Sequence, residues 1–226
     1  MGTVSFGLAL VVAPVLLLFL DPQSVVVISN VLIVLLLSVV LFELRRHLKL
    51  GQIKGMIIGG IFAVPLGVFA LKVADPGLLR IIIGVVILIL GILILFNFKI
   101  PMVNHKMAGP TYGFLSSLSI TALSIGGPLA AIYVMSQRWS PPVLRVSLAF
   151  FFVSSYLIGC ILYFAAGLVN LDIVINVGLL MPGLVLGFVL AKVILGRINE
   201  DIFRYAALTV ILSGSVMLLV KEATGL

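Results

Sequence analysis

The octapeptide "TALSIGGP", residues 121–128, places two glycines and a proline inside a long apolar segment. Glycine and proline are the poorest helix formers, and proline also removes a backbone donor. In lipid, the N–H and C=O groups freed by such a break find no partner, so it is tolerated only where it is buried in protein or lines a wet cavity. The meaning of this break therefore depends on whether the chain around it lies in a membrane.

The composition predicts a membrane protein. Of the 226 residues, 63% are hydrophobic and 9% are charged, and the mean hydropathy is +1.40. A soluble domain cannot bury that much apolar surface. The uncharged runs 25–42 and 81–98 approach the roughly 20 residues that a helix needs to cross the hydrocarbon core, and the alternation typical of a membrane barrel is absent. We expect an all-α, polytopic helical membrane protein.

Eight apolar segments are separated by turn residues and charges. They span residues 3–20, 23–43, 54–73, 78–97, 108–137, 141–168, 172–193 and 202–220. The net charge of +7 is concentrated in the short breaks, which is typical of topology signals and gives no reason to expect nucleic acid. The single cysteine, Cys160, lies in an apolar run and is interpreted as a small buried hydrophobe.

The chain also repeats itself. The tripeptides "SFG" (5–7) and "SIG" (124–126), and the octets "LGVFALKV" (66–73) and "LGFVLAKV" (186–193), match at shifts of 119 and 120. Pro22 and Pro141 match at 119, and Arg80 and Arg204 at 124. Ordered matches of this kind indicate a duplicated unit, which is typical of transporter folds. The predicted halves are residues 1–100 and 101–226.

The positive-inside rule sets the orientation of the halves. If 108–137 dips into the membrane and returns to the same side, eleven cations share the cytoplasmic side: Arg45, Arg46, Lys49, Lys54, Lys99, Lys106, Arg138, Arg145, Lys192, Arg197 and Arg204. Only Lys72, Arg80 and Lys221 are then outside. Each half would be a hairpin plus three spanning helices, so the halves would be inverted repeats. A counterpart of 104–119 does not precede Met1, so the first half either starts short or uses a single hairpin arm.

The break in the second half is a candidate anion site. The N-terminal end of a half-helix offers free N–H donors and a partial positive charge. Ser124 would add a hydroxyl, Gly126 and Gly127 would add amides, and Pro128 suits a helix start. The alternative is that these small residues serve close helix packing.

Six further residues complete the candidate substrate site. Ser5, Gly7 and Pro14 form the weaker counterpart of the break in the first half, and Asn30 is the polar residue most costly to bury in the second segment. Gln137 and Arg145 flank the hairpin exit. Arg145 either sets topology as a surface cation or aims its guanidinium at an oxyanion.

The positions of the acidic residues exclude several classes of function. All seven lie at segment ends: Asp21, Glu43, Asp75, Asp172, Glu200, Asp201 and Glu222. A cation carrier or a carboxylate proton relay would place one at mid-membrane. Metal-ligand spacing, nucleophile–base pairs and phosphate-binding loops are also absent. We expect no enzyme, no cofactor and no metal, but a gradient-driven carrier of an anion or a neutral molecule.

The stretch "ALSIGGPLAAIYVMSQRWSPPVLRVSLAFFFV" (122–153) resembles the second signature of the sulfite exporter TauE/SafE family, through Gly126, Gly127, Pro128, Tyr133 and Arg145. "VSFGLALVVAPVLLLF" (4–19) resembles the first signature, with Leu8 and Leu10 in place of expected glycines. The resemblance implies a multi-pass permease of a prokaryotic inner (plasma) membrane, exporting sulfite or small organosulfonates. A proton or a sodium ion is the candidate coupling ion, and lipid is the expected surroundings.

Two alternatives stay open at this point. The chain could carry another small anion or a neutral solute on the same fold. It could also be a non-transporting membrane scaffold, since the first half-site is degraded. The sequence leaves the oligomeric state and the direction of transport undetermined.

Overall fold

The structure is a computed structural model and describes residues 8–95, 108–137, 139–194 and 200–224. These ranges contain helices and turns and no strand. The helices are α1 (Leu8–Leu16), α2 (Pro22–Leu44), the short 3-10 helix η1 (Arg45–His47), α3 (Leu50–Val73), α4 (Pro76–Leu95), α5 (Ala108–Leu123), α6 (Gly127–Ser136), α7 (Pro141–Ala165), α8 (Leu171–Ile194) and α9 (Glu200–Thr224). The all-α prediction is confirmed.

Four helices in the described ranges are long and apolar enough to cross a membrane. These spans are Pro22–His47, Leu50–Val73, Pro141–Ala165 and Leu171–Leu190. Large apolar side chains such as Phe62, Phe164 and Leu179 are more than two-thirds exposed, as expected of surfaces that face lipid. The structure therefore agrees with a polytopic helical membrane protein.

The first predicted segment, 3–20, is not a single span in the described part of the chain. α1 ends at Leu16, although the apolar run continues to Leu20. Beyond α1 the N–H groups of Leu18 and Phe19 bond three residues back, to Val15 and Leu16, so the chain tightens into turns before Asp21. The carboxylate of Asp21 then accepts the N–H of Ser24 at 2.8 Å and caps α2.

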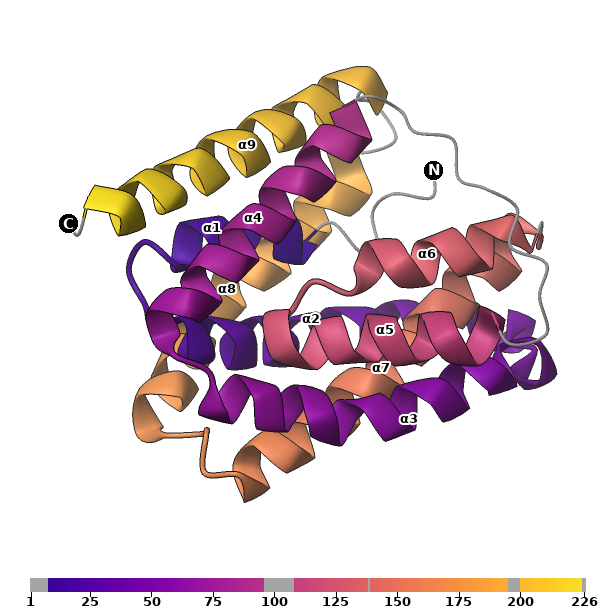
Figure 1. The fold of residues 1–226 in the computed structure, drawn as a ribbon. Coiled ribbons are helices and arrows are strands. Elements are labelled where there is room, and N and C mark those ends of the chain that lie inside the picture. The colour runs from indigo at the N-terminus through magenta and orange to yellow at the C-terminus, as the bar shows by residue number, and fades with distance from the viewer. Residues whose placement is uncertain (1–7, 96–107, 138, 195–199, 225–226) are drawn as a thin grey trace.

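The closest helix pair is α3 with α5, and glycines make the close approach possible. α3 carries Gly55 and Gly59, and α5 carries Gly109 and Gly113, each pair four residues apart. A Cβ at Gly59 would collide with the backbone of Pro110, and one at Gly113 with the backbone carbonyl of Met56. These are the small-residue contacts that let membrane helices meet backbone to backbone. In Figure 1, α3 and α5 run side by side.

The remaining helices pack around this pair in two groups. α2 and α7 pack against each other, and α7 also contacts α3 and α5. On the other side α4 pairs with α9, and α1 lies against α9 and α2 (Figure 1). One apolar core includes Val26 and Ile28 of α2 together with Ile83 of α4 and Leu218 of α9. A second core joins Leu37 of α2, Ile120 of α5 and Phe151 of α7.

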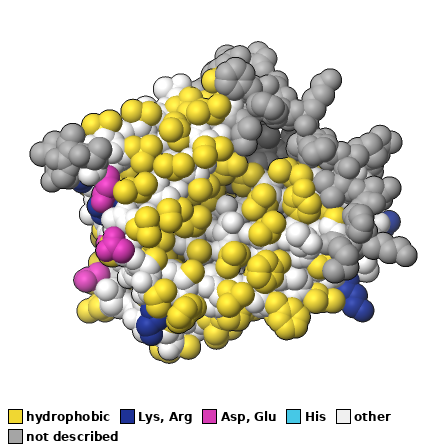
Figure 2. Space-filling model, viewed as in Figure 1, with side chains coloured by type: hydrophobic (Ala, Val, Ile, Leu, Met, Phe, Trp, Pro, Cys, Tyr) yellow, Lys and Arg dark blue, Asp and Glu magenta, His cyan; other side chains and the backbone are white. Residues whose placement is uncertain are grey.

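Charged side chains gather at the ends of the helices. On the face shown in Figure 2, apolar side chains cover the middle and the charged ones lie toward the margins. η1 packs against α7, whose first turn carries Arg145, and the early part of α3 packs on the start of α5. One end of the bundle therefore carries Arg45, Arg46, Lys49, Lys54 and Arg145.

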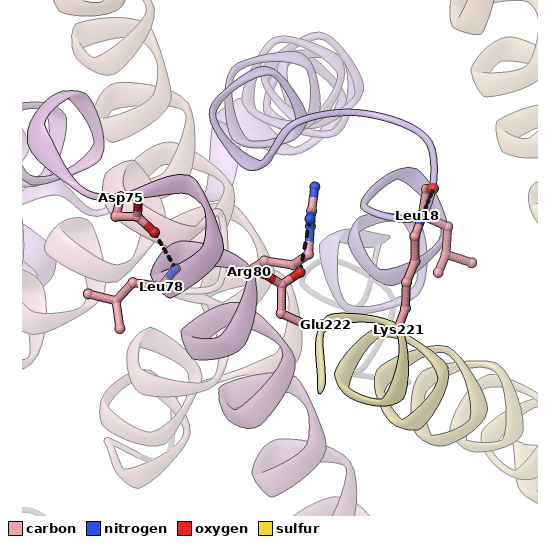
Figure 3. Close-up of polar contacts among 6 residues, drawn as sticks. All are labelled: Leu18, Asp75, Leu78, Arg80, Lys221 and Glu222. Carbon is pink, nitrogen blue, oxygen red and sulfur yellow. Dashed lines mark hydrogen bonds and ion pairs between the residues drawn. The ribbon is translucent and has the colours of Figure 1, made fainter. Parts of the chain in front are cut away.

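The opposite end carries charges of both signs. Arg80 Nη1 lies 2.9 Å from Glu222 Oε2, and Lys221 Nζ donates to the Leu18 carbonyl at 2.8 Å (Figure 3). Asp75 caps α4 by accepting the N–H of Leu78 at 3.0 Å. Arg80 and Lys221 thus lie at the end opposite Arg45, Arg46, Lys49, Lys54 and Arg145, and the side of the membrane that each end faces stays a prediction. The duplication into residues 1–100 and 101–226 stays a prediction.

Candidate functional site

The segment 108–137 forms a helical hairpin. Tyr133 of α6 stacks on Tyr112 of α5, with ring centroids 6.1 Å apart, and Ser116 Oγ donates to the Gly126 carbonyl at 2.7 Å. α6 therefore runs back along α5, and both arms open toward the same end of the bundle. The arms differ in length. α5 has 16 residues, about 24 Å of helix, and α6 has 10 residues, about 15 Å.

The turn begins with a backbone conformation that serine rarely adopts. Ser124 follows the last residue of α5 with φ of 61°, in the left-handed region. Its N–H donates to the Ile120 carbonyl at 2.8 Å, which ends the helix as a left-handed C-cap. Glycine is the usual residue here, because a residue with a Cβ raises the free energy of this conformation by about 1–2 kcal/mol. The contacts of the Ser124 side chain must offset that strain.

Those contacts form a buried polar cluster. Ser124 Oγ donates to Asn30 Oδ1 at 2.8 Å, and Asn30 Nδ2 donates to the Tyr163 hydroxyl at 2.7 Å and to the Ile120 carbonyl at 3.3 Å. The Tyr163 hydroxyl donates in turn to the Thr121 carbonyl at 2.6 Å. Asn30, Thr121, Ser124 and Tyr163, here called the turn cluster, are all nearly fully buried. They tie the hairpin turn to α2 and α7.

The sequence anticipated two members of the turn cluster as site residues and missed Tyr163. Asn30 was singled out because it is costly to bury, and Ser124 because of the break, and the structure brings the two into contact. Tyr163 lies 42 residues after Thr121, on another helix. A buried tyrosine needs a partner for its hydroxyl, but only the packing of α7 reveals which one.

The start of α6 presents unpaired backbone donors. Gly126 is its N-cap and Gly127 its first residue, and Pro128 occupies the first turn as the sequence predicts. Within the described chain, the N–H groups of Gly126 and Gly127 have no acceptor. These are the orphan donors of a helix N-terminus, where the helix dipole adds partial positive charge. A Cβ at Gly126 would collide with Ile120 and the Ser116 carbonyl, so only glycine fits.

Another polar atom without a partner lies near the turn cluster along the chain. Ser29, directly before Asn30 on α2, is fully buried, and its Oγ has no hydrogen-bond partner among the described residues. A buried hydroxyl is ordinarily bonded, so this oxygen is available as a donor or an acceptor. The hairpin turn and α2 together hold donors that the protein itself does not use.

The two polar residues at the hairpin exit are not brought to the turn. Arg145 precedes Tyr163 by 18 residues on α7, which is about 27 Å of helix. Gln137 caps the far end of α6, where its Nε2 lies 3.1 Å from Ser136 Oγ. Among the described residues, no contact joins the Arg145 side chain to the break, and its role toward an oxyanion stays a prediction. Its place in the first turn of α7, beside η1, fits a cation at the basic end of the bundle.

Of the predicted first-half counterparts of the break, only Pro14 lies in the described chain. Ser5 and Gly7 lie outside the described residues. Pro14 lies inside α1, and its Cβ would be 2.9 Å from a Cβ on Gly214 of α9. The structure therefore shows Pro14 in a helix–helix contact. Ala13 of α1 and Leu17, directly after α1, nevertheless belong to the same apolar core as Ile125 and Tyr163.

A family model describes almost the whole chain. The model "Sulfite exporter TauE/SafE" matches residues 1–218. The chain belongs to the sulfite exporter TauE/SafE family. No curated protein and no solved structure matches it.

Membership in the TauE/SafE family fixes the general class of the protein. It is an integral membrane transporter, whose substrate is a small anion and whose surroundings are lipid. Over the residues that the structure describes, no group of three or more His, Cys, Asp or Glu side chains could hold a metal ion. The polar groups of the hairpin turn and the turn cluster are backbone amides, hydroxyls and one carboxamide, all neutral.

Proposed function

We propose that this chain is a secondary transporter that exports a small sulfur oxyanion, such as sulfite or an organosulfonate. The observation that carries the proposal is the pair of buried, unpaired N–H groups of Gly126 and Gly127 at the N-terminus of α6. An oxyanion is the ligand that such donors accept most readily. The family match supports the same substrate class.

The neighbouring neutral groups suit an anion that must leave again. Hydroxyl and carboxamide groups donate hydrogen bonds without the strong attraction of a full positive charge. Ser124 Oγ now donates to Asn30, so substrate would have to compete with the turn cluster for this donor. The strained φ of Ser124 makes the turn a candidate moving part, because such strain persists only while surrounding contacts hold it. Alternating access would rock the two halves about this turn.

Labelled sulfite flux into proteoliposomes tests the proposal. The full chain is reconstituted, sulfate and sulfoacetate are offered as competitors, and a proton or a sodium gradient is imposed in turn. Saturable flux that one competitor blocks would support an anion permease and name its substrate class. The gradient that accelerates flux names the coupling ion. A folded protein without flux for any of these anions would overturn the sulfur oxyanion assignment.

Asn30→Asp locates the site within the same assay. The substitution keeps the size of a turn-cluster side chain and replaces the Nδ2 donor by an oxygen, so an approaching anion meets an acceptor in place of a donor. We expect sulfite flux to fall by about tenfold or more. Ser117→Ala is the matched control, because Ser117 is also a buried polar residue but bonds to Ser155, 2.8 Å away on α7. Normal flux in a folded Asn30→Asp protein would place the substrate elsewhere.

A further inference from the structure

A groove at the basic end of the bundle is not part of the candidate transport site. It has a volume of about 320 Å³ and is lined by Ser38, Leu41, Phe42, Arg45, Leu48 and Phe150. Ser38, Leu41 and Phe42 of α2 and Arg45, its C-cap, follow the spacing i, i+3, i+4 and i+7, so they lie on one face of the end of α2. Phe150 of α7 forms the other wall. The groove therefore runs for about 10 Å along α2, from Ser38 to Arg45.

The walls and the mouth of the groove differ in chemistry. Its walls are leucine and phenylalanine side chains, and the hydroxyl of Ser38 is bonded back to the Val34 carbonyl at 2.6 Å. At the mouth, the Arg45 guanidinium carbon lies 4.3 Å from the centre of the Phe42 ring. This cation–π contact holds the charge beside the apolar cavity. Within the described chain Arg45 has no carboxylate partner.

The surrounding charge is strongly positive. Residues 43–54 contain Arg45, Arg46, Lys49 and Lys54 against a single acid, Glu43. Arg45, Arg46, His47 and Lys49 are all exposed, and α7, with Arg145 in its first turn, packs against η1. Such clusters at a helix end also set topology, and a helix C-terminus favours a cation by its dipole. Charge alone therefore does not define a site, but the apolar groove beside it does.

We propose that this groove binds an anionic phospholipid, with one acyl chain along Leu41, Phe42 and Phe150 and the headgroup phosphate on Arg45. Both parts of the ligand are needed. The apolar walls recognise hydrocarbon, and the guanidinium recognises a phosphate through charge-assisted hydrogen bonds. A basic pocket between transmembrane helices near the membrane surface is a typical place for an anionic headgroup. The lipid would bridge α2 and α7, the helices that also carry Asn30 and Tyr163 of the turn cluster.

Native mass spectrometry of the delipidated full-length protein in detergent tests this proposal. Dioleoyl phosphatidylglycerol is titrated against dioleoyl phosphatidylcholine, which has the same chains and a zwitterionic headgroup. We expect one phosphatidylglycerol to bind about fivefold or more tightly than phosphatidylcholine. Equal binding of the two lipids would overturn the proposal. So would displacement of phosphatidylglycerol by an equal concentration of inorganic phosphate, because the groove would then recognise the phosphate alone.

Three variants separate a built site from diffuse attraction. Arg45→Gln removes the headgroup contact, and Ser38→Phe fills the groove without changing any charge. Both should lower phosphatidylglycerol affinity to the phosphatidylcholine level. Lys54→Gln is the matched control, since it removes an exposed cation of the same cluster that does not line the groove, and its effect should stay within about twofold because of screening. An equal loss in Lys54→Gln and Arg45→Gln, or unchanged binding in Ser38→Phe, would overturn the proposal.

A fourth variant keeps the test decisive if Ser38→Phe does not fold. Phe42→Leu retains an apolar wall but removes the ring under the Arg45 guanidinium. Phosphatidylglycerol affinity should fall while phosphatidylcholine affinity stays the same. Melting temperatures in lipid-free detergent, equal to that of the unmodified chain, establish that each variant is folded. A folded Phe42→Leu protein with full preference for phosphatidylglycerol would contradict the assigned headgroup position.

Discussion

Helices α3 and α8 contain nearly the same octet but lie in different surroundings. Gly67 in "LGVFALKV" faces α5, where an added Cβ would collide with Thr121 Oγ1 and lie 3.0 Å from the Leu118 carbonyl. Gly187 in "LGFVLAKV" has no atom of the described chain within 4 Å of such a Cβ, and the same holds for Gly178 and Gly183. In the most apolar 18-residue stretch of each span, 6% of the residues are buried in Leu171–Leu190, against 44% in Leu50–Val73.

The difference shows that a small-residue motif acquires its role from a partner. In α3 the glycines remove Cβ atoms exactly where the backbone of α5 passes; in α8 the equivalent surface faces away from the described chain. Similar sequence in two halves therefore predicts similar helices, but it does not predict similar contacts. Small residues in a membrane helix permit close packing without requiring it. This comparison can be tested directly, because the two glycines occupy matching positions.

Gly67→Ala and Gly187→Ala are the matched pair with the largest expected contrast. The new methyl group at residue 67 must displace Thr121 or the α5 backbone, so we expect the free energy of unfolding to fall by about 1–3 kcal/mol. At residue 187 the methyl group meets open space, so the change should stay within about 0.5 kcal/mol. Denaturant or thermal unfolding of the two purified variants in the same detergent measures both. Equal losses would mean that α8 has a close partner too.

The hairpin turn and α1 provide a second comparison. Both are short segments that contribute side chains to the same apolar core. The turn is held by the buried hydrogen bonds of the turn cluster. α1 is followed by a turn whose Leu18 carbonyl accepts from Lys221, at a partly exposed helix end. Buried hydrogen bonds are worth more than exposed charge contacts, because their groups find no substitute partner in water.

Asn30→Leu should therefore destabilise the protein through the turn. It leaves Ser124 Oγ without its acceptor and removes one of the contacts of the Tyr163 hydroxyl. Tyr163 keeps its bond to the Thr121 carbonyl, so the expected loss is about 1–3 kcal/mol and not more. Thermal unfolding in detergent gives the value. An Asn30→Leu protein as stable as the unmodified chain would show that the hairpin packs firmly without the turn cluster.

Arg80→Gln, near the start of α4, should lower the free energy of unfolding by less than Asn30→Leu does. The Arg80 and Glu222 side chains are 25% and 22% exposed, so water already solvates part of the pair that joins α4 to α9 (Figure 3). Screening limits the loss to about 1 kcal/mol. The double variant Arg80→Gln with Glu222→Gln isolates the pairwise contribution. A coupling energy larger than that between Asn30 and Ser124 would show that the ion pair contributes more to stability than the buried hydrogen bond does.

The sequence predicted the helical class, the hairpin and two of the turn-cluster residues because each rests on local signals. Apolar length reveals a span, and Gly-Gly-Pro reveals a break. Tyr163 and the distance between Arg145 and the turn could not be predicted, since they depend on how α7 lies against α2 and α5. Residue 145 stands close to the break in the sequence, but α6 leads the chain away before α7 begins. The different packing of Gly67 in α3 and Gly187 in α8 could not be predicted either, because it also depends on which helices lie next to each other.

Ser124→Gly is expected to change stability least and transport most clearly. Glycine relieves about 1–2 kcal/mol of left-handed strain, while the lost hydrogen bond to Asn30 costs about 0.5–1.5 kcal/mol, so the two nearly cancel. The melting temperature should therefore stay close to that of the unmodified chain. If the hydroxyl serves the substrate, sulfite flux in proteoliposomes should nevertheless fall. Normal flux together with raised stability would mean that the serine is a strained remnant without a role, and that the backbone amides of Gly126 and Gly127 suffice.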